Sequence, residues 1–362
     1  MRDRNQETRN SSIELLRIIM AMGVIVLHYN NAGMGGGFKF VEEGSSNHLF
    51  LFFSESLFIC AVNVFIMISG YYLCTTEKRN FIRVVELIIQ VIISNFVAYI
   101  VFGFRGEIEI SIRGIVGCFF PINYYVILYS ALYLISPYIN LLIKRLDKDI
   151  FRKFVILSFL IFSVYTFGVD YAEKISGLEL NGLSTVGLHG SSGGYTIVNF
   201  ILIYIIGAYI RINIETIKRQ RVAVVLLSMI LGVYVITIFE YKSGLGYGTV
   251  WNYNNPMIII ISACVLLLFR EIKIYSKIIN ELAKGAFTCF LFHVIFFKYF
   301  NIEEAVAMPL PILILHQIIM VITIYIVSYL IYKLYSLFRK PIIKLISPFS
   351  KKIDEILLDN LN

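Results

Sequence analysis

Residues 13–31 read IELLRIIMAMGVIVLHYNN, an apolar run long enough to cross a bilayer as a helix. The run contains Glu14, Arg17 and His28, and an ionisable residue inside a spanning segment indicates a functional site unless it only packs or reaches the interface. Eleven residues of helix, at about 100° each, leave Arg17 and His28 on one face, about 16 Å apart along the axis. Glu14 precedes Arg17 by three residues, so an ion pair between them would turn the guanidinium toward the protein.

The composition of the whole chain agrees with a membrane protein. Of its 362 residues 58% are hydrophobic and 15% are charged, and the mean hydropathy is +0.77. We therefore expect an all-α, polytopic integral membrane protein with no separate soluble domain. Ten apolar runs are predicted to span the bilayer, at about 13–31, 52–73, 84–104, 119–142, 154–171, 196–211, 222–241, 254–270, 286–300 and 310–333.

The basic residues predict the orientation of these spans. If the N-terminus is cytoplasmic, 25 of the 32 Lys and Arg residues fall in cytoplasmic segments, six fall in outer segments, and Arg17 lies within the first span. This asymmetry places both termini in the cytoplasm, Arg17 toward the inner side and His28 toward the outer side. The first span lacks a small-residue cleavage site, so we expect a retained anchor. The protein is expected in the plasma membrane as a multi-pass protein.

Two classes of partner are not expected. The net charge of +8 comes from short basic clusters between apolar runs, so it sets orientation and does not indicate nucleic acid. The five cysteines lie in or beside apolar segments without paired spacing, so neither a disulfide framework nor a metal site is predicted. Residues 334–362, which interleave apolar and basic residues, are predicted to form a cytoplasmic amphipathic tail on the inner membrane surface.

Several polar or small residues lie at the inner end of the second span or just after it. Ser69 and Gly70 follow one another, and such a pair indicates either close helix packing or a place where a ligand approaches the backbone. Lys78, Arg79 and Arg83 come next, where they would attract phosphates or anionic headgroups, although a purely topological role is the simpler explanation for each.

Other polar residues gather at the predicted outer ends of spans. The ninth span also carries His293 about midway, where a lone histidine is by default a hydrogen-bonded packing residue. Two imidazoles at a similar depth could share a cavity, however, which gives His28 and His293 more weight together. The candidates for an acceptor site are Glu55, Asn123, Tyr124, Tyr125, Trp251, Asn254 and His293, and for the aromatic ones an interfacial belt is the alternative.

Five segments together resemble the membrane-bound acyltransferase-3 family. Arg17 and His28 match its R-x10-H signature, and NVFIMISGYYL at 63–73 is similar to its FFxxSGyxL segment, with Ile66 in place of one Phe. NYYVILYSALYLISPYIN at 123–140 resembles YWFxxxYxxLYLxSPfxN, with Asn123 and Tyr124 in place of Tyr and Trp. YNNPMIIIISACVLLLF at 253–269 and AKGAFTCFLFH at 283–293 resemble the later yNNP and fgiYLiH segments. The likeness covers nearly the whole chain, with residues 1–333 as the family domain, and is nearest to single-domain members that modify polysaccharides.

The resemblance implies transfer of an acyl group, usually acetyl from cytoplasmic acetyl-CoA, to a hydroxyl of a cell-surface or capsular polysaccharide or its lipid-linked precursor. Arg17 would then pair with the donor's phosphates and Glu14 would orient it, while Ser69, Lys78, Arg79 and Arg83 are further candidates for donor binding or support. His28 would act as general base or become transiently acylated, and we favour the base. Acetyl-CoA is expected as a substrate, with no bound cofactor.

Two other functions remain open from the sequence. In a flippase or exporter of lipid-linked glycans, Arg17 and His28 would form a substrate or proton pathway. In a structural or sensor membrane protein, the charged residues would only specify helix packing. The acceptor sugar, the acyl group and the oligomeric state are not determined by these residues.

Overall fold

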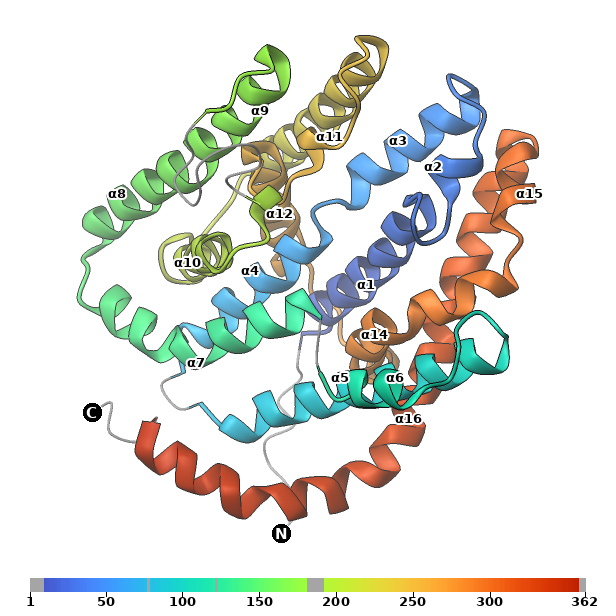
Figure 1. Cartoon of the computed structure of the whole chain (residues 1–362). Helices are drawn as coiled ribbons and strands as arrows, with labels where there is room; N and C mark the ends of the chain where they lie inside the picture. The colour runs from blue at the N-terminus through green and yellow to red at the C-terminus, as the bar shows by residue number, and fades with distance from the viewer. Residues whose placement is uncertain (1–9, 77–78, 121–122, 181–191, 358–362) are drawn as a thin grey trace.

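The computed structural model describes residues 10–76, 79–120, 123–180 and 192–357, and Lys78 lies outside them. Within these ranges the chain forms helices and no strand, as expected for an all-α protein (Figure 1). The elements are α1 (Ser12–Asn30), α2 (Gly37–Phe40), α3 (Ser46–Phe58), α4 (Ala61–Leu73), α5 (Phe81–Phe104), α6 (Ile112–Gly117), α7 (Tyr124–Lys144), α8 (Lys148–Phe159), η1 (Leu160–Tyr165), α9 (Thr166–Ser176), η2 (Ser192–Gly194), α10 (Ile197–Asn213), α11 (Arg219–Lys242), η3 (Thr249–Trp251), α12 (Pro256–Arg270), α13 (Lys277–Leu282), η4 (Ala283–Gly285), α14 (Ala286–Phe296), η5 (Phe297–Tyr299), α15 (Ile302–Ala307) and α16 (Leu310–Leu357).

Nine helical stretches of the described chain are long and apolar enough to cross a membrane. The remaining expected span, the sixth at 196–211, corresponds to α10, an apolar helix of 17 residues that is shorter than the other nine. The second span begins at Ser46, whereas the sequence predicted a start at position 52. The difference arises because Asn47 donates hydrogen bonds to the carbonyls of Val306 and Met308, so this polar residue is buried in a helix that hydropathy alone would end.

Two glycines bring α4 and α10 into close contact at the centre of the bundle. A Cβ atom at Gly70 would lie 2.1 Å from the carbonyl oxygen of Tyr204, and one at Gly207 would lie 2.2 Å from that of Met67. Small residues at a membrane helix interface allow this approach of two backbones. Of the two explanations for Gly70, packing is therefore the one that the structure supports, because the backbone is covered by α10.

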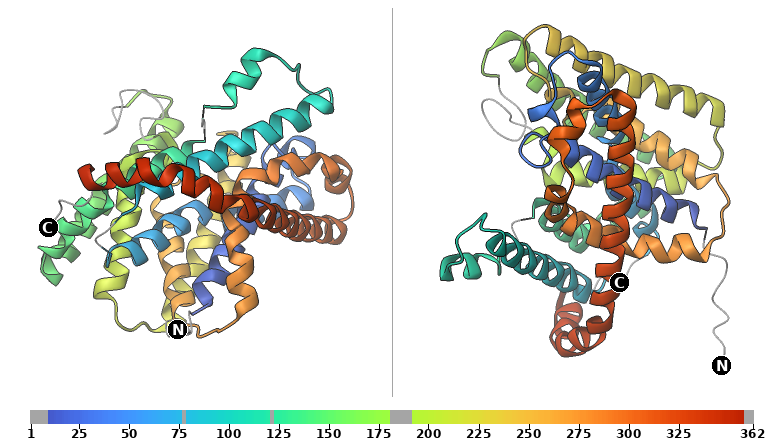
Figure 2. Two further views of the ribbon diagram at one scale, coloured as in Figure 1. Left: turned by 90° about the horizontal axis from the view of Figure 1, so that it is seen from below. Right: turned by 90° about the vertical axis from the view of Figure 1, so that its right-hand side faces the viewer.

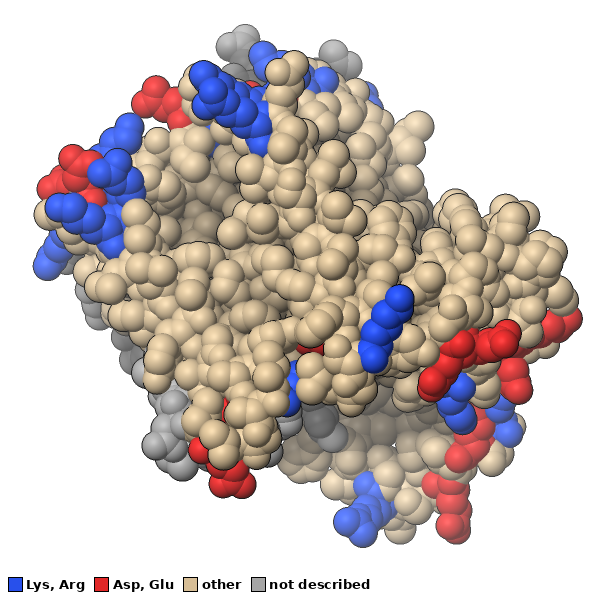
Figure 3. Space-filling model, turned by 90° about the horizontal axis from the view of Figure 1, so that it is seen from above, with Lys and Arg blue, Asp and Glu red and all other residues tan. Residues whose placement is uncertain are grey.

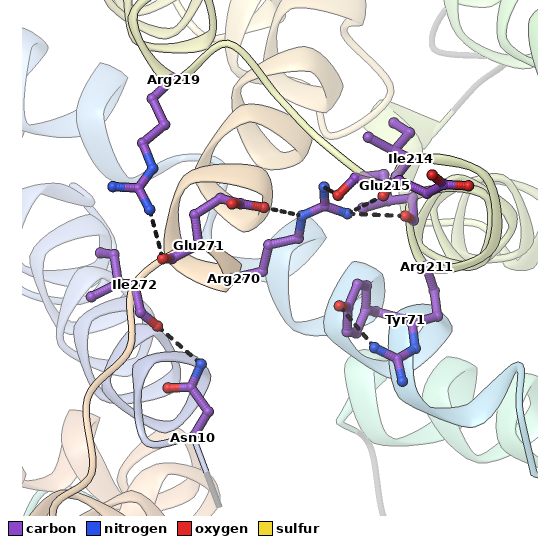
Figure 4. Close-up of polar contacts among 10 residues, drawn as sticks. Asn10, Tyr71, Arg211, Ile214, Glu215, Arg219, Arg270, Glu271 and Ile272 are labelled. Atoms are coloured by element: carbon purple, nitrogen blue, oxygen red, sulfur yellow. Dashed lines mark hydrogen bonds and ion pairs between the residues drawn. The ribbon is translucent and has the colours of Figure 1, made fainter.

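One end of the bundle collects the segments that were predicted to be cytoplasmic. Arg270 at the end of α12 donates to the carbonyls of Ile210 and Ile214 at the end of α10, at 3.2 and 2.7 Å (Figure 4). Arg219 at the start of α11 donates to the carbonyl of Glu271 at 2.8 Å, and Asn10 donates to that of Ile272 at 2.9 Å. Arginine side chains thus bind carbonyl groups that helix ends leave unpaired.

The opposite end collects the segments that were predicted to be outside. The N–H of Tyr253 donates to the carbonyl of Gly193 at 2.8 Å, which joins the start of α12 to the loop before α10. Figure 3 shows, on the face seen from above, most charged side chains gathered toward the edges, and a broad surface between them with few charged side chains. This separation of the loops and the charges agrees with the predicted crossing of a bilayer.

The last helix, α16, is 48 residues long and passes through position 333 without a break. It contains Pro341 and Pro348, and its C-terminal part turns beneath the bundle and runs beside the start of α5 (Figures 1 and 2). Proline inside a helix is a common cause of such bends. The Asp354 carboxylate accepts a hydrogen bond from the N–H of Phe81 at 2.7 Å, so the expected tail continues α16 and contacts the bundle.

Candidate active site

The outer half of α1 places His28 beside His293 of α14. Nδ1 of His28 is hydrogen-bonded to Nε2 of His293, and the two rings stack with their centroids 4.7 Å apart and their planes at 23°. His293 is buried with 2% of its surface exposed, whereas His28 is partly exposed. Of the two imidazoles, only that of His28 therefore offers a surface to a substrate.

The contacts of the pair determine which ring nitrogens carry protons when both rings are neutral. Nδ1 of His293 lies 2.9 Å from the carbonyl oxygen of Cys289, and a carbonyl can only accept, so this nitrogen carries a proton. Nε2 of His293 is then the acceptor, and Nδ1–H of His28 is the donor. The lone pair of His28 consequently lies on Nε2, the nitrogen that faces away from His293.

At the inner half of α1, Arg17 and Glu14 form the ion pair that their spacing predicted. Nη1 of Arg17 lies 3.5 Å from Oε2 of Glu14. The carboxylate is nearly buried, with 8% of its side chain exposed, while 33% of the arginine side chain is exposed. Glu14 thus restrains the guanidinium and leaves part of its surface available for an anion.

A row of tyrosines on α7 contacts α4 and α14. Tyr125 and Tyr129 lie one helical turn apart and stack at 5.7 Å between centroids, and Tyr125 also packs against Phe290 of α14 at 5.2 Å. Ser69 of α4 donates to the hydroxyl of Tyr129 at 3.3 Å. Tyr125 and Ser69 were predicted from the sequence as candidate site residues. Tyr129 was not, although its spacing of four residues from Tyr125 places both on one face of a helix.

The end of α1 is held by a buried polar network that the sequence analysis recognised only in part. Asn30 donates to Oε2 of Glu55 on α3 at 2.8 Å, and Gln317 of α16 donates to Oδ1 of Asn30 at 3.2 Å. All three side chains are buried. Glu55 therefore contacts the helix that carries His28, and Gln317, a polar residue in an apolar span, was the signal for the missing member.

The basic residues at the inner end of α4 have different environments. Arg79 is 5% exposed and donates to Oγ of Ser136 at 2.7 Å and to the carbonyls of Leu73 and Thr76 at 3.0 and 3.1 Å, so these contacts bind it to the end of α4. Arg83 is exposed and lines a cavity of about 470 Å³, together with Arg79, Tyr133 and Lys351. Arg83 is thus better placed than Arg79 to contact a phosphate from the cytoplasm.

The remaining acceptor-site candidates each have partners within the protein. Oδ1 of Asn123 accepts from the N–H of Val126 and caps α7. Nε1 of Trp251 donates to Thr237 at 3.1 Å, and Nδ2 of Asn254 donates to Thr166 at 3.1 Å.

Tyr124 forms part of an aromatic group on the outer side. Its ring packs against that of Tyr195 at 4.7 Å, and the ring of Tyr195 packs against that of Tyr253 at 4.9 Å. The contacts of Asn123, Trp251 and Asn254 hold helix ends and loops. His293 instead contacts His28 directly, and Tyr125 packs against Phe290, three residues before His293.

Taken together, α1, α4, α7 and α14 place a base with a defined lone pair above a partly exposed guanidinium. An imidazole of this kind can remove a proton from a hydroxyl, and a guanidinium can bind a phosphate. The family model described as an acyltransferase domain matches residues 10–333, which include every element of this site. The chain matches no curated protein and no solved structure. The protein is therefore a member of the acyltransferase-3 family, whose members are membrane acyltransferases.

Proposed function

We propose that this membrane acyltransferase is an O-acetyltransferase that moves acetyl from cytoplasmic acetyl-CoA to a hydroxyl of a cell-surface or capsular polysaccharide or its lipid-linked precursor. The observation that carries the proposal is the hydrogen-bonded chain from the Cys289 carbonyl through His293 to His28. It leaves Nε2 of His28 as the acceptor that a substrate hydroxyl needs. His293 is a positioning residue in this scheme and does not contact the acceptor.

The proposed reaction uses His28 twice. Nε2 takes the proton of the acceptor hydroxyl while the hydroxyl oxygen attacks the thioester carbonyl carbon and forms the new C–O bond. When the tetrahedral intermediate collapses, the C–S bond breaks and the thiolate leaves with its electron pair. His28 returns the proton to this thiolate, so an ester and a free thiol are produced and the imidazole is neutral again.

The donor would enter from the cytoplasmic end of the bundle. Arg83 and Lys351, which line the inner cavity, and Arg17 farther along α1 supply cations for its phosphates. Tyr133 lines the same cavity, and Tyr129 and Tyr125 follow it on one face of α7 at intervals of four residues. The arm of the donor that carries the thioester could therefore follow this row of tyrosines toward His28.

The test is an acetyl-transfer assay on the purified protein in lipid nanodiscs with [¹⁴C]acetyl-CoA and membranes from the producing cells as the acceptor source. We expect His28→Ala to lower acetyl incorporation about 10²- to 10⁴-fold. His316→Gln is the matched control, because His316 lies on α16 and contacts Tyr29. Unchanged incorporation by His28→Ala would refute the proposed role of His28, and absence of incorporation by the native chain would refute the acetyl assignment.

A further inference from the structure

A second cavity, of about 520 Å³, lies at the outer end of the bundle, and its lining includes residues next to the imidazole pair. Phe297 lines this cavity and also contacts His293, with the ring centroids 5.7 Å apart. Gly35 lines it too, and its N–H donates to the carbonyl of His28 at 2.9 Å. The cavity is therefore separated from His293 by the ring of Phe297, and it meets the main chain at the end of α1 through Gly35.

The wall formed by α5 and η5 carries more positive than negative charge. Oε1 of Glu107 lies 2.8 Å from Nζ of Lys298 and 3.7 Å from Nη1 of Arg105, so one carboxylate serves two cations. Arg105 also donates to the carbonyl of Ile295 at the end of α14, at 3.1 Å. Glu303 lines the cavity from α15 and is its other acidic residue. Two cations that share one carboxylate can pair with a phosphate group.

An apolar groove of about 410 Å³ lies along α14, nearer the inner side of the bundle, between α5, α14 and α16. Thr288 and Leu291 of α14 line the groove, while Val294 and Lys298 line the outer cavity. Thr288, Leu291 and Val294 follow one another at intervals of three and so share a face of α14, and Lys298 lies on η5, which directly follows this helix. The rise from Leu291 to Val294 is about 4.5 Å. A polar cavity above an apolar groove on one helix face matches an amphiphilic ligand.

The hairpin that bounds the outer cavity exposes large apolar side chains. Phe104 at the end of α5 is 85% exposed and Ile112 at the start of α6 is 82% exposed, and Phe119 and Phe120 are also exposed. In a membrane protein such side chains are expected in contact with lipid. The cavity therefore has one side that faces lipid in the outer half of the bilayer, from which a membrane-bound ligand can enter.

We propose that the outer cavity and the groove bind the acceptor as a lipid-linked saccharide phosphate. The phosphate pairs with Arg105 and Lys298, the hydrocarbon chain lies along α14 in the groove, and the saccharide extends toward His28. Phe40, Phe102 and Phe300 supply aromatic faces for the sugar rings. This inference rests on the proposed acetyl transfer and specifies the form in which its acceptor is presented.

The test is photo-crosslinking in phosphatidylglycerol nanodiscs with a polyprenyl-phosphate-linked N-acetylglucosamine that carries a diazirine in its chain. We expect labelled peptides from α5, α14 and α16, which line the groove, and competition by the unlabelled lipid-linked sugar but not by soluble N-acetylglucosamine 1-phosphate. Lys298→Gln, with Arg105→Gln as a second variant, is expected to lower labelling about tenfold, because each removes a charge-assisted contact. Arg113→Gln removes a positive charge from the same hairpin outside the cavity lining and is expected to label as the native chain does.

Three results would overturn the inference: labelling spread evenly over the lipid-facing helices, labelling unchanged in both variants, or equal competition by the soluble sugar phosphate. Cross-linking requires no acetyl transfer, so His28→Ala is expected to label normally. Acetylation of a soluble glycan without specific labelling would reject the lipid-linked acceptor and leave the acetyltransferase proposal standing. Specific labelling without any acetyl transfer would reject the acetyltransferase proposal and leave the binding of a lipid-linked saccharide phosphate standing.

Discussion

Replacing His293 tests whether it directs the proton of His28. His293→Leu removes the acceptor at Nε2, so nothing then holds the proton of His28 on Nδ1 and its lone pair on Nε2. Loss of the acceptor leaves Nδ1–H of His28 without its partner, which costs about 1–3 kcal/mol. At 1.4 kcal/mol per factor of ten, kcat is expected to fall about 5- to 150-fold, less than the loss expected for His28→Ala.

His293→Gln is the matched variant, because the amide oxygen of glutamine can occupy the position of Nε2 and accept the same hydrogen bond. It is expected to recover much of the kcat that leucine loses. The assay is the initial rate of [¹⁴C]acetyl transfer in nanodiscs over a range of acetyl-CoA concentrations, with membrane insertion and Tm measured alongside. Since His293 does not touch the donor, the KM for acetyl-CoA is expected to stay unchanged in both variants.

Three outcomes would refute this reasoning. A native kcat in His293→Leu, with His28→Ala inactive, would show that His28 needs no partner. Equal losses in His293→Leu and His293→Gln would show that the acceptor at Nε2 is not what matters. A fall in Tm and in the amount inserted that accounts for the whole loss of rate would assign His293 to packing alone.

Three further predictions concern packing and the donor. Gly70→Ala is expected to destabilise the protein by about 1–3 kcal/mol, because the new Cβ would meet the Tyr204 carbonyl, and thermal unfolding should show a lower Tm. Gly168→Ala is the control, because the space at its Cβ is open, and it should not lower the Tm. Equal Tm values for the two variants would contradict the close contact of α4 and α10. Arg17→Lys keeps the charge but loses the forked geometry, so the KM for acetyl-CoA is expected to rise about tenfold with little change in kcat, and an unchanged KM would exclude a contact with the phosphates. Arg79→Gln is expected to lower the Tm, because it removes hydrogen bonds to carbonyls at the end of α4. Arg83→Gln is expected to raise the KM for acetyl-CoA and to leave the Tm unchanged. A raised KM in Arg79→Gln with an unchanged KM in Arg83→Gln would show that Arg79 binds the donor.

Most of the helices could be predicted from the sequence, because apolar runs of about 20 residues satisfy their backbone only as helices in lipid. The errors fell where polar residues are buried by tertiary contacts. Asn47 lies inside the second span because carbonyls of the α15 region accept its hydrogen bonds. The C-terminal part of α16 contacts the start of α5 through Asp354, which no local pattern indicated.

The candidate site divides in the same way. The pairing of Glu14 with Arg17 and their shared face with His28 follow from helical periodicity, since they lie on one helix. The roles of Gly70 and Arg79 did not follow, because both depend on what another segment presents: α10 covers the first, and Ser136 of α7 binds the second. Periodicity cannot distinguish a covered face from an open one.

The sequence by itself determined the class of protein, the positions of most of its spans and the helix that carries Arg17 and His28, because hydropathy and helical repeat are local properties. The tertiary structure alone decided that His293 is the partner of His28 and that the Cys289 carbonyl directs the proton between them. His28 and His293 are separated by 265 positions in the chain, and only the packing of α14 against α1 brings them within hydrogen-bonding distance.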